Sequence, residues 1–451
     1  MLIENKSLDI FKDALELLEK GFQDLPEYDS NLDIAALRKI LLKVAERMQN
    51  NFPYPHPMYA GQMLKPPHPI ARLAYALSLW INPNNHALDG GIASSMMEKE
   101  AITELARMFS WKNHLGHICS GGTMANLEAL WIAGNLQPGK KVIASQQAHY
   151  THERICAVLK IPFDSVPCDN KARMDLNALK VLLEKGDIGT VVVTIGTTAT
   201  GSVDPLEEII NLQLQYGFRI HADAAYGGFY ILTKNLYPET LAVFSCLPKV
   251  DSIVIDPHKH GLQPYGCGCV LFRDPAVGRF YQHDSPYTYF SSNKLHLGEI
   301  SLECSRPGAS AVALWATQQL LPFTPGGVFA NDLEKSRKAA IKFAEMIQND
   351  LRFMTAMKPE LDIVVWAPKA KSASEVSYLS KAIFKESALR HLHLALVNLP
   401  TSMIMDVWRG TEWDQDTVTC LRSCLMKPEH LDWIDRIWQA LDSATFAALK
   451  Y

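Results

Sequence analysis

Two residues of this chain have the types and the spacing for chemistry on an amino group. Lys259 lies in the run Asp-Pro-His-Lys-His-Gly at residues 256–261, and Asp223 lies in the run His-Ala-Asp-Ala-Ala-Tyr-Gly-Gly at residues 221–228. Each run follows a short apolar stretch with the pattern of a strand, so neighbouring strand ends are expected to bring the amine and the carboxylate together. A lysine can hold the aldehyde of pyridoxal phosphate as a Schiff base, and a buried aspartate can keep its pyridine nitrogen protonated. The pair therefore predicts a pyridoxal phosphate site.

A turn with two glycines and a hydroxyl residue lies earlier in the chain. Ser-Gly-Gly-Thr at residues 120–123 ends a strand-like run and precedes a helical stretch that starts at Met124. Glycine lets the backbone approach an anion, and the start of a helix offers free N–H groups and a favourable dipole. Gly122 and Thr123 are therefore predicted to bind a phosphate, although such a turn taken alone is more often a helix cap.

A metal site is the competing interpretation of the same residues. His221 and Asp223 are two positions apart, so a strand would point both side chains to one side, a spacing that a metal site can use. Together with His149 and His258 they would serve a metal-dependent hydrolase, which predicts a colourless protein, whereas a Schiff base gives a yellow one. Lys259 and the Gly-Gly-Thr turn would then have no role, so no metal is expected.

The nine cysteines do not indicate a metal centre or a disulfide framework. Their number is odd, and neither Cys267 with Cys269 nor Cys420 with Cys424 has the C-x-x-C spacing of a zinc site. They are expected to be reduced thiols of a cytoplasmic protein.

Alternating strand-like and helical runs between residues 115 and 275 predict the element that positions these side chains. Such alternation favours a mostly parallel central sheet sandwiched by helices, with ligand groups in the loops at the carboxyl ends of the strands. The predicted strands are 117–119, 141–144, 190–195, 218–221, 252–255 and 267–272, and the predicted helices are 123–133, 152–160, 176–184 and 206–215. The fold class is therefore α/β.

The first part of the chain is predicted to be an accessory arm. Residues 1–68 combine two amphipathic helices, at 8–18 and 32–48, with a loop rich in proline and aromatic residues. Asn31 is expected to cap the second helix.

A cluster of helix breakers at residues 322–327 is expected to separate two domains. We predict a large α/β domain that binds the cofactor, 69–324, and a small C-terminal α+β domain, 325–451. The strands expected in the small domain are 363–366, 393–397, 403–407 and 419–425.

Composition places the chain among ordinary globular proteins. Its 451 residues are 48% hydrophobic and 20% charged, and 44 basic residues face 48 acidic ones, for a formal charge of -4. Balanced charge gives no sign of a nucleic-acid partner, so a small-molecule partner is expected. No apolar run approaches the ~20 residues that span a bilayer, and we expect a cytoplasmic protein without a membrane partner.

The combined string of motifs resembles the pyridoxal-phosphate-dependent group II amino-acid decarboxylases, which have the fold type I of aspartate aminotransferase. The matching stretches occur in the family's order and extend over most of the chain: 119–130, 146–154, 196–204, 221–229, 256–261 and 303–308. The resemblance implies a homodimer whose active sites are shared between the subunits.

The resemblance also implies roles for the residues around the ring of the cofactor. Lys259 is similar to the Schiff-base lysine, and Asp223 to the partner of the pyridine nitrogen. His149 matches the imidazole that stacks over the ring, and Ala225 the residue beneath it.

The phosphate and the ring hydroxyl have implied contacts as well. Gly122, Thr123 and His258 match positions that bind the phosphate, and Thr198 matches one near the ring hydroxyl. Ser305 is similar to a phosphate contact donated by the neighbouring subunit.

The resemblance extends to substrate binding and proton transfer. Arg422 is similar to the arginine that grips the substrate carboxylate, so that CO2 leaves Cα instead of a proton. The acid that returns a proton to Cα is often a loop tyrosine in this family, and Tyr287 and Tyr289 are candidates, with His258 another. Asp256 stands where many members that act on aromatic amino acids have Asn, and the Asp form is more similar to prokaryotic tyrosine, aspartate or diaminobutyrate decarboxylases.

The predicted reaction is decarboxylation of an L-amino acid to the amine and CO2, by way of an external aldimine and a quinonoid. A carbon–carbon lyase that acts on a phosphorylated amino alcohol is the alternative, since such relatives use the same lysine, aspartate and phosphate elements. A scaffold or regulatory protein that kept the fold without the activity is a third interpretation, and the intact candidates at every cofactor position count against it.

Overall fold

The computed structural model describes residues 5–26, 32–87, 90–282 and 301–449, and its centre is a seven-stranded sheet. The strands are β1 (Leu115–Cys119), β2 (Lys141–Ser145), β3 (Phe163–Val166), β4 (Ile188–Thr194), β5 (Arg219–Asp223), β6 (Ser252–Ile255) and β7 (Gly268–Phe272). Their order is β1-β7-β6-β5-β4-β2-β3. The five strands β2 to β6 are parallel, and β7 is antiparallel to both of its neighbours, β1 and β6. This confirms the predicted α/β class with a mostly parallel sheet.

Apolar β-branched residues explain why these segments form buried strands. In β4 every residue is buried, as expected for a parallel sheet covered on both faces. Val191 and Val193 belong to one hydrophobic cluster and Val192 to another, because successive side chains point to opposite faces of the sheet.

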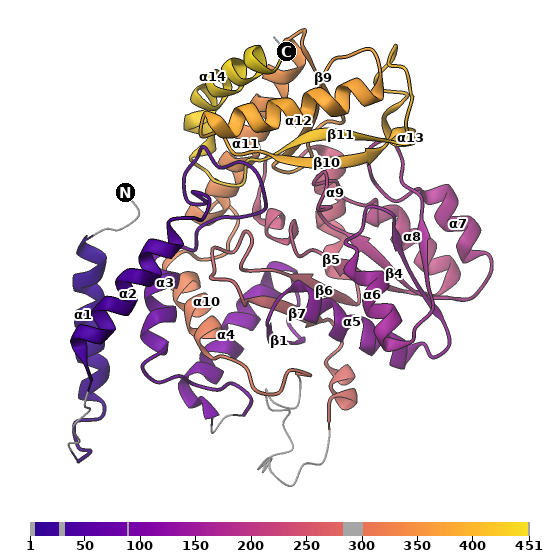
Figure 1. The fold of residues 1–451 in the computed structure, drawn as a ribbon. Coiled ribbons are helices and arrows are strands. Elements are labelled where there is room, and N and C mark those ends of the chain that lie inside the picture. The colour runs from indigo at the N-terminus through magenta and orange to yellow at the C-terminus, as the bar shows by residue number, and fades with distance from the viewer. Residues whose placement is uncertain (1–4, 27–31, 88–89, 283–300, 450–451) are drawn as a thin grey trace.

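Helices flank this sheet and pack on it (Figure 1). They are α4 (Ile92–Met108), α5 (Gly122–Leu136), α6 (Thr151–Leu159), α7 (Leu176–Leu183), α8 (Leu206–Tyr216), α9 (Pro238–Cys246) and α10 (Ala309–Leu320), with α3 (Pro69–Ser78) packed on α10. In the described part of the chain, no helix is long and apolar enough to cross a membrane.

A second, antiparallel sheet of four strands lies beside the first, with its own core (Figure 1). The strand order is β10-β11-β9-β8. The strands are β8 (Phe353–Thr355), β9 (Ile363–Pro368), β10 (Ala395–Pro400) and β11 (Thr417–Cys424). The helices of this part are α11 (Val328–Asn349), α12 (Ala373–Leu389), α13 (Thr401–Ile404) and α14 (His430–Ala448). The boundary predicted near residue 324 falls between α10, which packs on α3 and α4, and α11, which packs on α14 and β8. The domain limits themselves stay a prediction.

The N-terminal arm consists of α1 (Asn5–Lys20) and α2 (Ile34–Met48) and leads into the proline-rich segment 52–68, which we call the strap. The strap crosses to the small sheet, where Ala60 donates its N–H to His393 and accepts one from Cys424. It then returns to the large sheet, since the N–H of His68 donates to Leu262, three residues after Lys259. The strap therefore ties the small domain to the loop of the predicted Schiff-base lysine.

Two local predictions are wrong. Residues 403–407 form no strand: the chain makes the short helix α13 and a turn, because it must reverse between the paired strands β10 and β11. The cap of α2 is Asp33, whose side chain accepts the N–H of Ala36, and not Asn31, which lies outside the described residues. An aspartate directly before the first turn satisfies a free N–H that a residue farther upstream cannot reach.

Candidate active site

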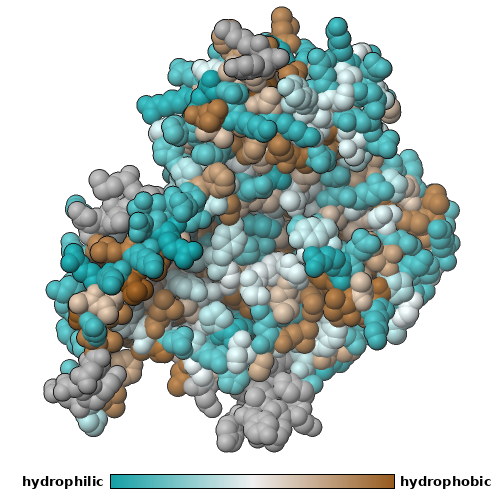
Figure 2. Space-filling model, viewed as in Figure 1, coloured by the Kyte–Doolittle hydropathy of each residue, from teal (hydrophilic) through white to brown (hydrophobic). Residues whose placement is uncertain are grey.

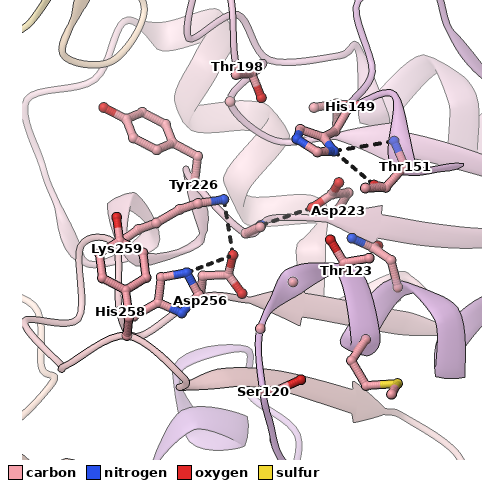
Figure 3. A pocket seen from close by; sticks show the side chains of 18 residues that line it. Ser120, Thr123, His149, Thr151, Thr198, Asp223, Tyr226, Asp256, His258 and Lys259 are labelled. Carbon is pink, nitrogen blue, oxygen red and sulfur yellow. Dashed lines mark hydrogen bonds and ion pairs between the residues drawn. The ribbon is translucent and has the colours of Figure 1, made fainter. Parts of the chain in front are cut away.

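A cavity of about 350 Å³ lies at the carboxyl ends of β4, β5 and β6. Three of its residues mark those ends: Thr194 closes β4, Asp223 closes β5, and Asp256 directly follows β6. The start of α5 and the loop before α6 complete the wall (Figure 3). The lining consists of Ser120, Gly121, Gly122, Thr123, Met124, Asn126, His149, Thr151, Thr194, Gly196, Thr198, Asp223, Ala225, Tyr226, Asp256, His258, Lys259 and Tyr265.

Lys259 and Asp223 reach this cavity from neighbouring strands. β5 and β6 pair in parallel, with Asp223 opposite Val254, so the loops after both strands meet at one edge of the sheet. Figure 3 shows the two side chains on opposite sides of the same space. Lys259 Nζ forms an ion pair with the buried Asp256 carboxylate, 3.0 Å from Oδ2. The amine and the carboxylate that the sequence predicted as a pair thus face one cavity.

The Asp223 carboxylate is buried and held at both oxygens. Oδ2 lies 2.9 Å from Nε2 of His152, and Oδ1 accepts the N–H of Ala225 at 3.2 Å. Burial by itself would raise the pKa of Asp223, but the hydrogen bond from His152 and the charges of His152 and Lys259 outweigh it and hold the pKa below its ordinary value. Asp223 is therefore an ionised carboxylate at neutral pH.

His149 presents its imidazole to the same cavity. Its Nδ1 accepts hydrogen bonds from the backbone N–H and from the hydroxyl of Thr151, at 3.3 and 2.8 Å. Burial lowers the pKa of His149, so the ring is uncharged at neutral pH and carries its proton on Nε2. Ala225, which also lines the cavity, adds only a methyl group and leaves room for a flat ring.

The start of α5 forms an anion cradle in the cavity wall. Among the described residues no side chain caps its first turn, so backbone N–H groups at Gly122 and Thr123 are available. A Cβ at Gly122 would lie 2.6 Å from Asp256 Oδ2, so only glycine fits there. His258 stands beside the cradle with its Nδ1 donating to the carbonyl of Cys267 at 2.9 Å, and burial lowers its pKa.

These groups fit pyridoxal phosphate. The amine of Lys259 suits the aldehyde carbon, the ionised Asp223 suits a protonated ring nitrogen, and the start of α5 suits the phosphate. Thr198 lines the cavity too.

Two of the predicted residues do not line the cavity. Arg422, on β11, is buried beside it and donates to the carbonyl of Thr198 at 3.0 Å and to Oε1 of Gln62 at 2.6 Å. Ser305 is exposed, accepts from Asn84 at 3.2 Å, and is not in the cavity of its own chain. Tyr289, with Tyr287, lies outside the described residues.

His221 cannot serve the metal site considered as an alternative. Its two nitrogens bond to Ser252 and Asn126, each at 2.8 Å, and burial lowers its pKa to about 3. Within the described ranges, no group of three or more His, Cys, Asp or Glu side chains is placed to hold a metal ion.

Several contacts within the site were not predicted from the sequence. Asp256 precedes Lys259 by three positions, a turn spacing that signals its ion pair. His152 follows His149 by three positions, which signals a second imidazole on the same turn. Gln62 has no local signal, because only the path of the strap brings it to Arg422.

Comparison with known proteins agrees with this geometry. Residues 128–369 match the family described as "Pyridoxal-dependent decarboxylase conserved domain". A probable L-tyrosine/L-aspartate decarboxylase of Methanothermobacter thermautotrophicus is 30% identical over 70% of this chain and 85% of its own length. An L-tyrosine decarboxylase of Enterococcus faecium is 26% identical over 93% of this chain and 89% of its own.

Solved structures share the fold. The Oryza sativa TDC structure with PLP and tryptamine has a TM-score of 0.78 at 17% identity, covering 98% of this chain and 96% of that one. The glutamate decarboxylase domain of the Vibrio parahaemolyticus diaminobutyrate-pyruvate transaminase and L-2,4-diaminobutyrate decarboxylase has a TM-score of 0.75 at 18% identity, covering 99% and 94%. This confirms the fold type I architecture. The cavity, its chemistry and the family match together establish that the chain belongs to the pyridoxal-dependent decarboxylases and is a carboxy-lyase with pyridoxal phosphate as its cofactor.

Proposed function

We propose that this decarboxylase acts on an aromatic L-amino acid, with L-tyrosine as the first substrate to test. The placement of Lys259 and Asp223 in one cavity, beside the anion cradle of α5, carries the assignment of the reaction to this site. The relatives named L-tyrosine decarboxylases support the choice of substrate, since they cover most of this chain.

The charges around the cavity also support an uncharged substrate side chain. Among the described residues that line it, Lys259 is the one lysine or arginine, and Asp256 already pairs with it. An acidic side chain would need a further cation once Arg422 binds the α-carboxylate. Tyr265 and Met124 offer apolar and aromatic surface in the same wall, which suits a phenyl ring.

Several cavity residues have a role in this proposal. Bound pyridoxal phosphate supplies an electron-withdrawing ring that accepts the electron pair left on Cα when CO2 departs. Lys259 binds the aldehyde carbon, and Asp223 holds a proton on the ring nitrogen. His149 and Ala225, which both line the cavity, would contact the ring.

The remaining cavity groups orient the cofactor. Gly122, Thr123 and His258, which line the cavity, would bind the phosphate, and Thr198 would serve the ring hydroxyl. Because these groups lie at the start of α5 and in the loops after β4 and β6, they would hold the cofactor in place before substrate enters.

Arg422 selects the bond that breaks. Its planar guanidinium can bind a carboxylate through two parallel hydrogen bonds, and it is already held by Gln62 and by the carbonyl of Thr198. A carboxylate held there would be the group of the substrate that is released as CO2, with bound pyridoxal phosphate supplying the electron-withdrawing ring. The proton returned to Cα comes from a nearby acid, for which Tyr289 is the first candidate and His258 the second.

The experiment that tests the substrate is a CO2-release assay with purified protein, pyridoxal phosphate and a panel of acidic, basic and aromatic L-amino acids. We expect L-tyrosine to give the highest kcat/KM. Higher turnover of L-aspartate would contradict the aromatic assignment. No CO2 from any amino acid would favour the carbon–carbon lyase.

A homodimer with shared active sites is part of the proposal. α2 carries an apolar stripe on its surface, formed by Leu37, Ile40, Leu41, Val44 and Met48, each at least half exposed, and no residue of α2 is buried in the single chain. Figure 2 shows hydrophobic side chains among charged ones on this arm. Ser305 is likewise exposed, and in this proposal it contacts the phosphate site of a partner.

The dimer is tested by light scattering after size-exclusion chromatography. We expect the wild type to elute as a dimer and Leu41→Glu to shift it toward monomer, because a charge cannot be buried in an apolar interface. A monomeric and fully active wild type would contradict the shared site.

A further inference from the structure

Asp223 has a buried partner to which the proposed function gives no role. His152 is the second residue of α6, and its Nε2 lies 2.9 Å from Asp223 Oδ2. Asp223 lines the cavity and His152 does not, so the imidazole stands behind the carboxylate. We propose that His152 is a positioning residue that orients and stabilises the buried Asp223 carboxylate toward the ring nitrogen of the cofactor. This inference rests on the proposed role of Asp223.

The local backbone explains how His152 comes to this place. The N–H of His152 donates to the carbonyl of His149 at 3.2 Å, which closes a turn at the start of α6. Thr151 fixes the His149 ring within the same turn. One short turn therefore supplies both the imidazole that lines the cavity and the imidazole that supports Asp223.

The contact restrains the carboxylate at both oxygens. His152 donates to Oδ2, and the N–H of Ala225 donates to Oδ1. A carboxylate oxygen can accept more than one hydrogen bond, so each remains able to accept one from the cavity. Asp223 is only 5% exposed, so the loss of His152 would leave its carboxylate with a single backbone donor, which disfavours the charged form.

The other charged groups near Asp223 do not replace His152. The titratable groups that face it are His152 on α6, His149 before α6, Lys259 after β6 and His221 on β5. His221 uses both nitrogens on Ser252 and Asn126 and is uncharged at neutral pH. Lys259 is already paired with the Asp256 carboxylate. Among the described residues, His152 is thus the side chain in direct contact with Asp223.

The test compares cofactor binding by the full-length wild type with that of His152→Phe. Binding is measured as quenching of protein fluorescence during titration with pyridoxal phosphate, and the absorbance of the bound cofactor is followed against pH. We expect His152→Phe to weaken binding by at least about tenfold, the effect of one hydrogen bond to a charged group. Its absorbance transition on the acidic side should move to higher pH, because Asp223 then takes up a proton more easily.

Two further variants separate positioning from a merely structural role. His152→Gln retains an N–H donor without a titratable ring, and should restore most of the affinity. His114→Ala removes a half-buried histidine outside the cavity and should leave both readouts unchanged. If His152→Phe does not fold, as judged by circular dichroism, His152→Ala carries the same test without added volume.

The outcome that overturns the inference is a folded His152→Phe with wild-type affinity and a wild-type absorbance transition. Asp223→Asn distinguishes this from a failure of the underlying proposal. If Asp223→Asn also leaves the absorbance unchanged, the proposed role of Asp223 is wrong. If Asp223→Asn changes the absorbance but the His152 variants change neither affinity nor absorbance, Asp223 acts without His152.

Discussion

Two parts of the active site are built in different ways. The cofactor cradle, which we define as Lys259, Asp223, Gly122 and Thr123, comes from the end of β5, the loop after β6 and the start of α5, all at one edge of the large sheet. The Arg422 junction, which we define as Arg422, Gln62 and Thr198, joins three segments that are far apart in the chain. Arg422 and Gln62 are separated by 360 positions.

The difference indicates how the two tasks are divided. The cradle depends on the strand order of the large sheet and is rigid once that sheet has formed. The junction depends on the strap and on the small sheet both docking correctly. Damage to the cradle should therefore abolish cofactor chemistry, whereas damage to the junction should spare the cofactor and weaken use of the substrate.

Replacement of Lys259 should have the largest effect. Lys259→Ala removes the amine, so the covalent link to the cofactor is lost and kcat for CO2 release should fall by at least about a thousandfold. The link is measured as the mass added to the protein after borohydride reduction. Lys249→Ala, at an exposed lysine outside the cavity, is the control and should behave as wild type. Wild-type turnover by Lys259→Ala would contradict the assignment of Lys259 to the cofactor cradle.

The cradle could be predicted from the sequence because its signals are local. An apolar run followed by Asp, or by Asp-Pro-His-Lys, marks a strand and the loop at its carboxyl end, and alternating runs predicted that these ends share one edge. The prediction needed no knowledge of distant contacts. It also gave the α/β class, since burial on both faces leaves continuous apolar runs such as β4.

The junction was predicted only in part, because its signals are not local. Arg422 was found by resemblance, but Gln62 lies in a proline-rich strap whose course depends on pairing with His393 and Cys424. Residues 403–407 were predicted as a strand because apolar residues alone do not distinguish a strand from a short buried helix. Side-chain partners such as His152 with Asp223 depend on packing between elements, which periodicity does not encode.

Removal of the arginine should separate substrate use from cofactor binding. Arg422→Ala should remove about 2–5 kcal/mol of transition-state stabilisation, the cost of losing one partner of a buried charge pair, and kcat/KM should fall accordingly. Cofactor affinity should be unchanged. The two quantities are measured by CO2 release and by cofactor titration. Arg422→Lys should recover little, since an ammonium cannot bind a carboxylate through two parallel hydrogen bonds. Equal losses of CO2 release and of cofactor affinity would show that the junction and the cradle do not have separate tasks. Unchanged amino-acid turnover would favour the lyase.

A pH-dependent anchor holds the strap near the junction. Lys427 Nζ donates to the carbonyl of Tyr59 at 2.6 Å, and burial lowers the pKa of Lys427 from 10.5 to about 7. Between these values the unfolded chain binds more protons than the native one, so the free energy of unfolding should rise with pH. The contribution approaches about 1.4 kcal/mol per pH unit.

Urea unfolding of wild type and Lys427→Met between about pH 7 and about pH 9 measures this contribution. We expect the free energy of unfolding to rise by about 2 kcal/mol more in the wild type than in Lys427→Met over that range, because methionine does not titrate. Parallel curves would show that Lys427 is not desolvated in the folded protein.

The smallest expected effect comes from Gln62, which orients Arg422 without carrying charge. Gln62→Ala should raise KM about fivefold, the cost of about 1 kcal/mol for one hydrogen bond, and leave cofactor affinity unchanged. Gln62→Glu is the sharper variant, since its carboxylate would hold the guanidinium in place while neutralising the charge that the substrate needs. If the guanidinium acts by binding the substrate carboxylate, Glu is worse than Ala. If Glu restores wild-type KM, Gln62 matters only for holding the strap, and the junction is a structural contact.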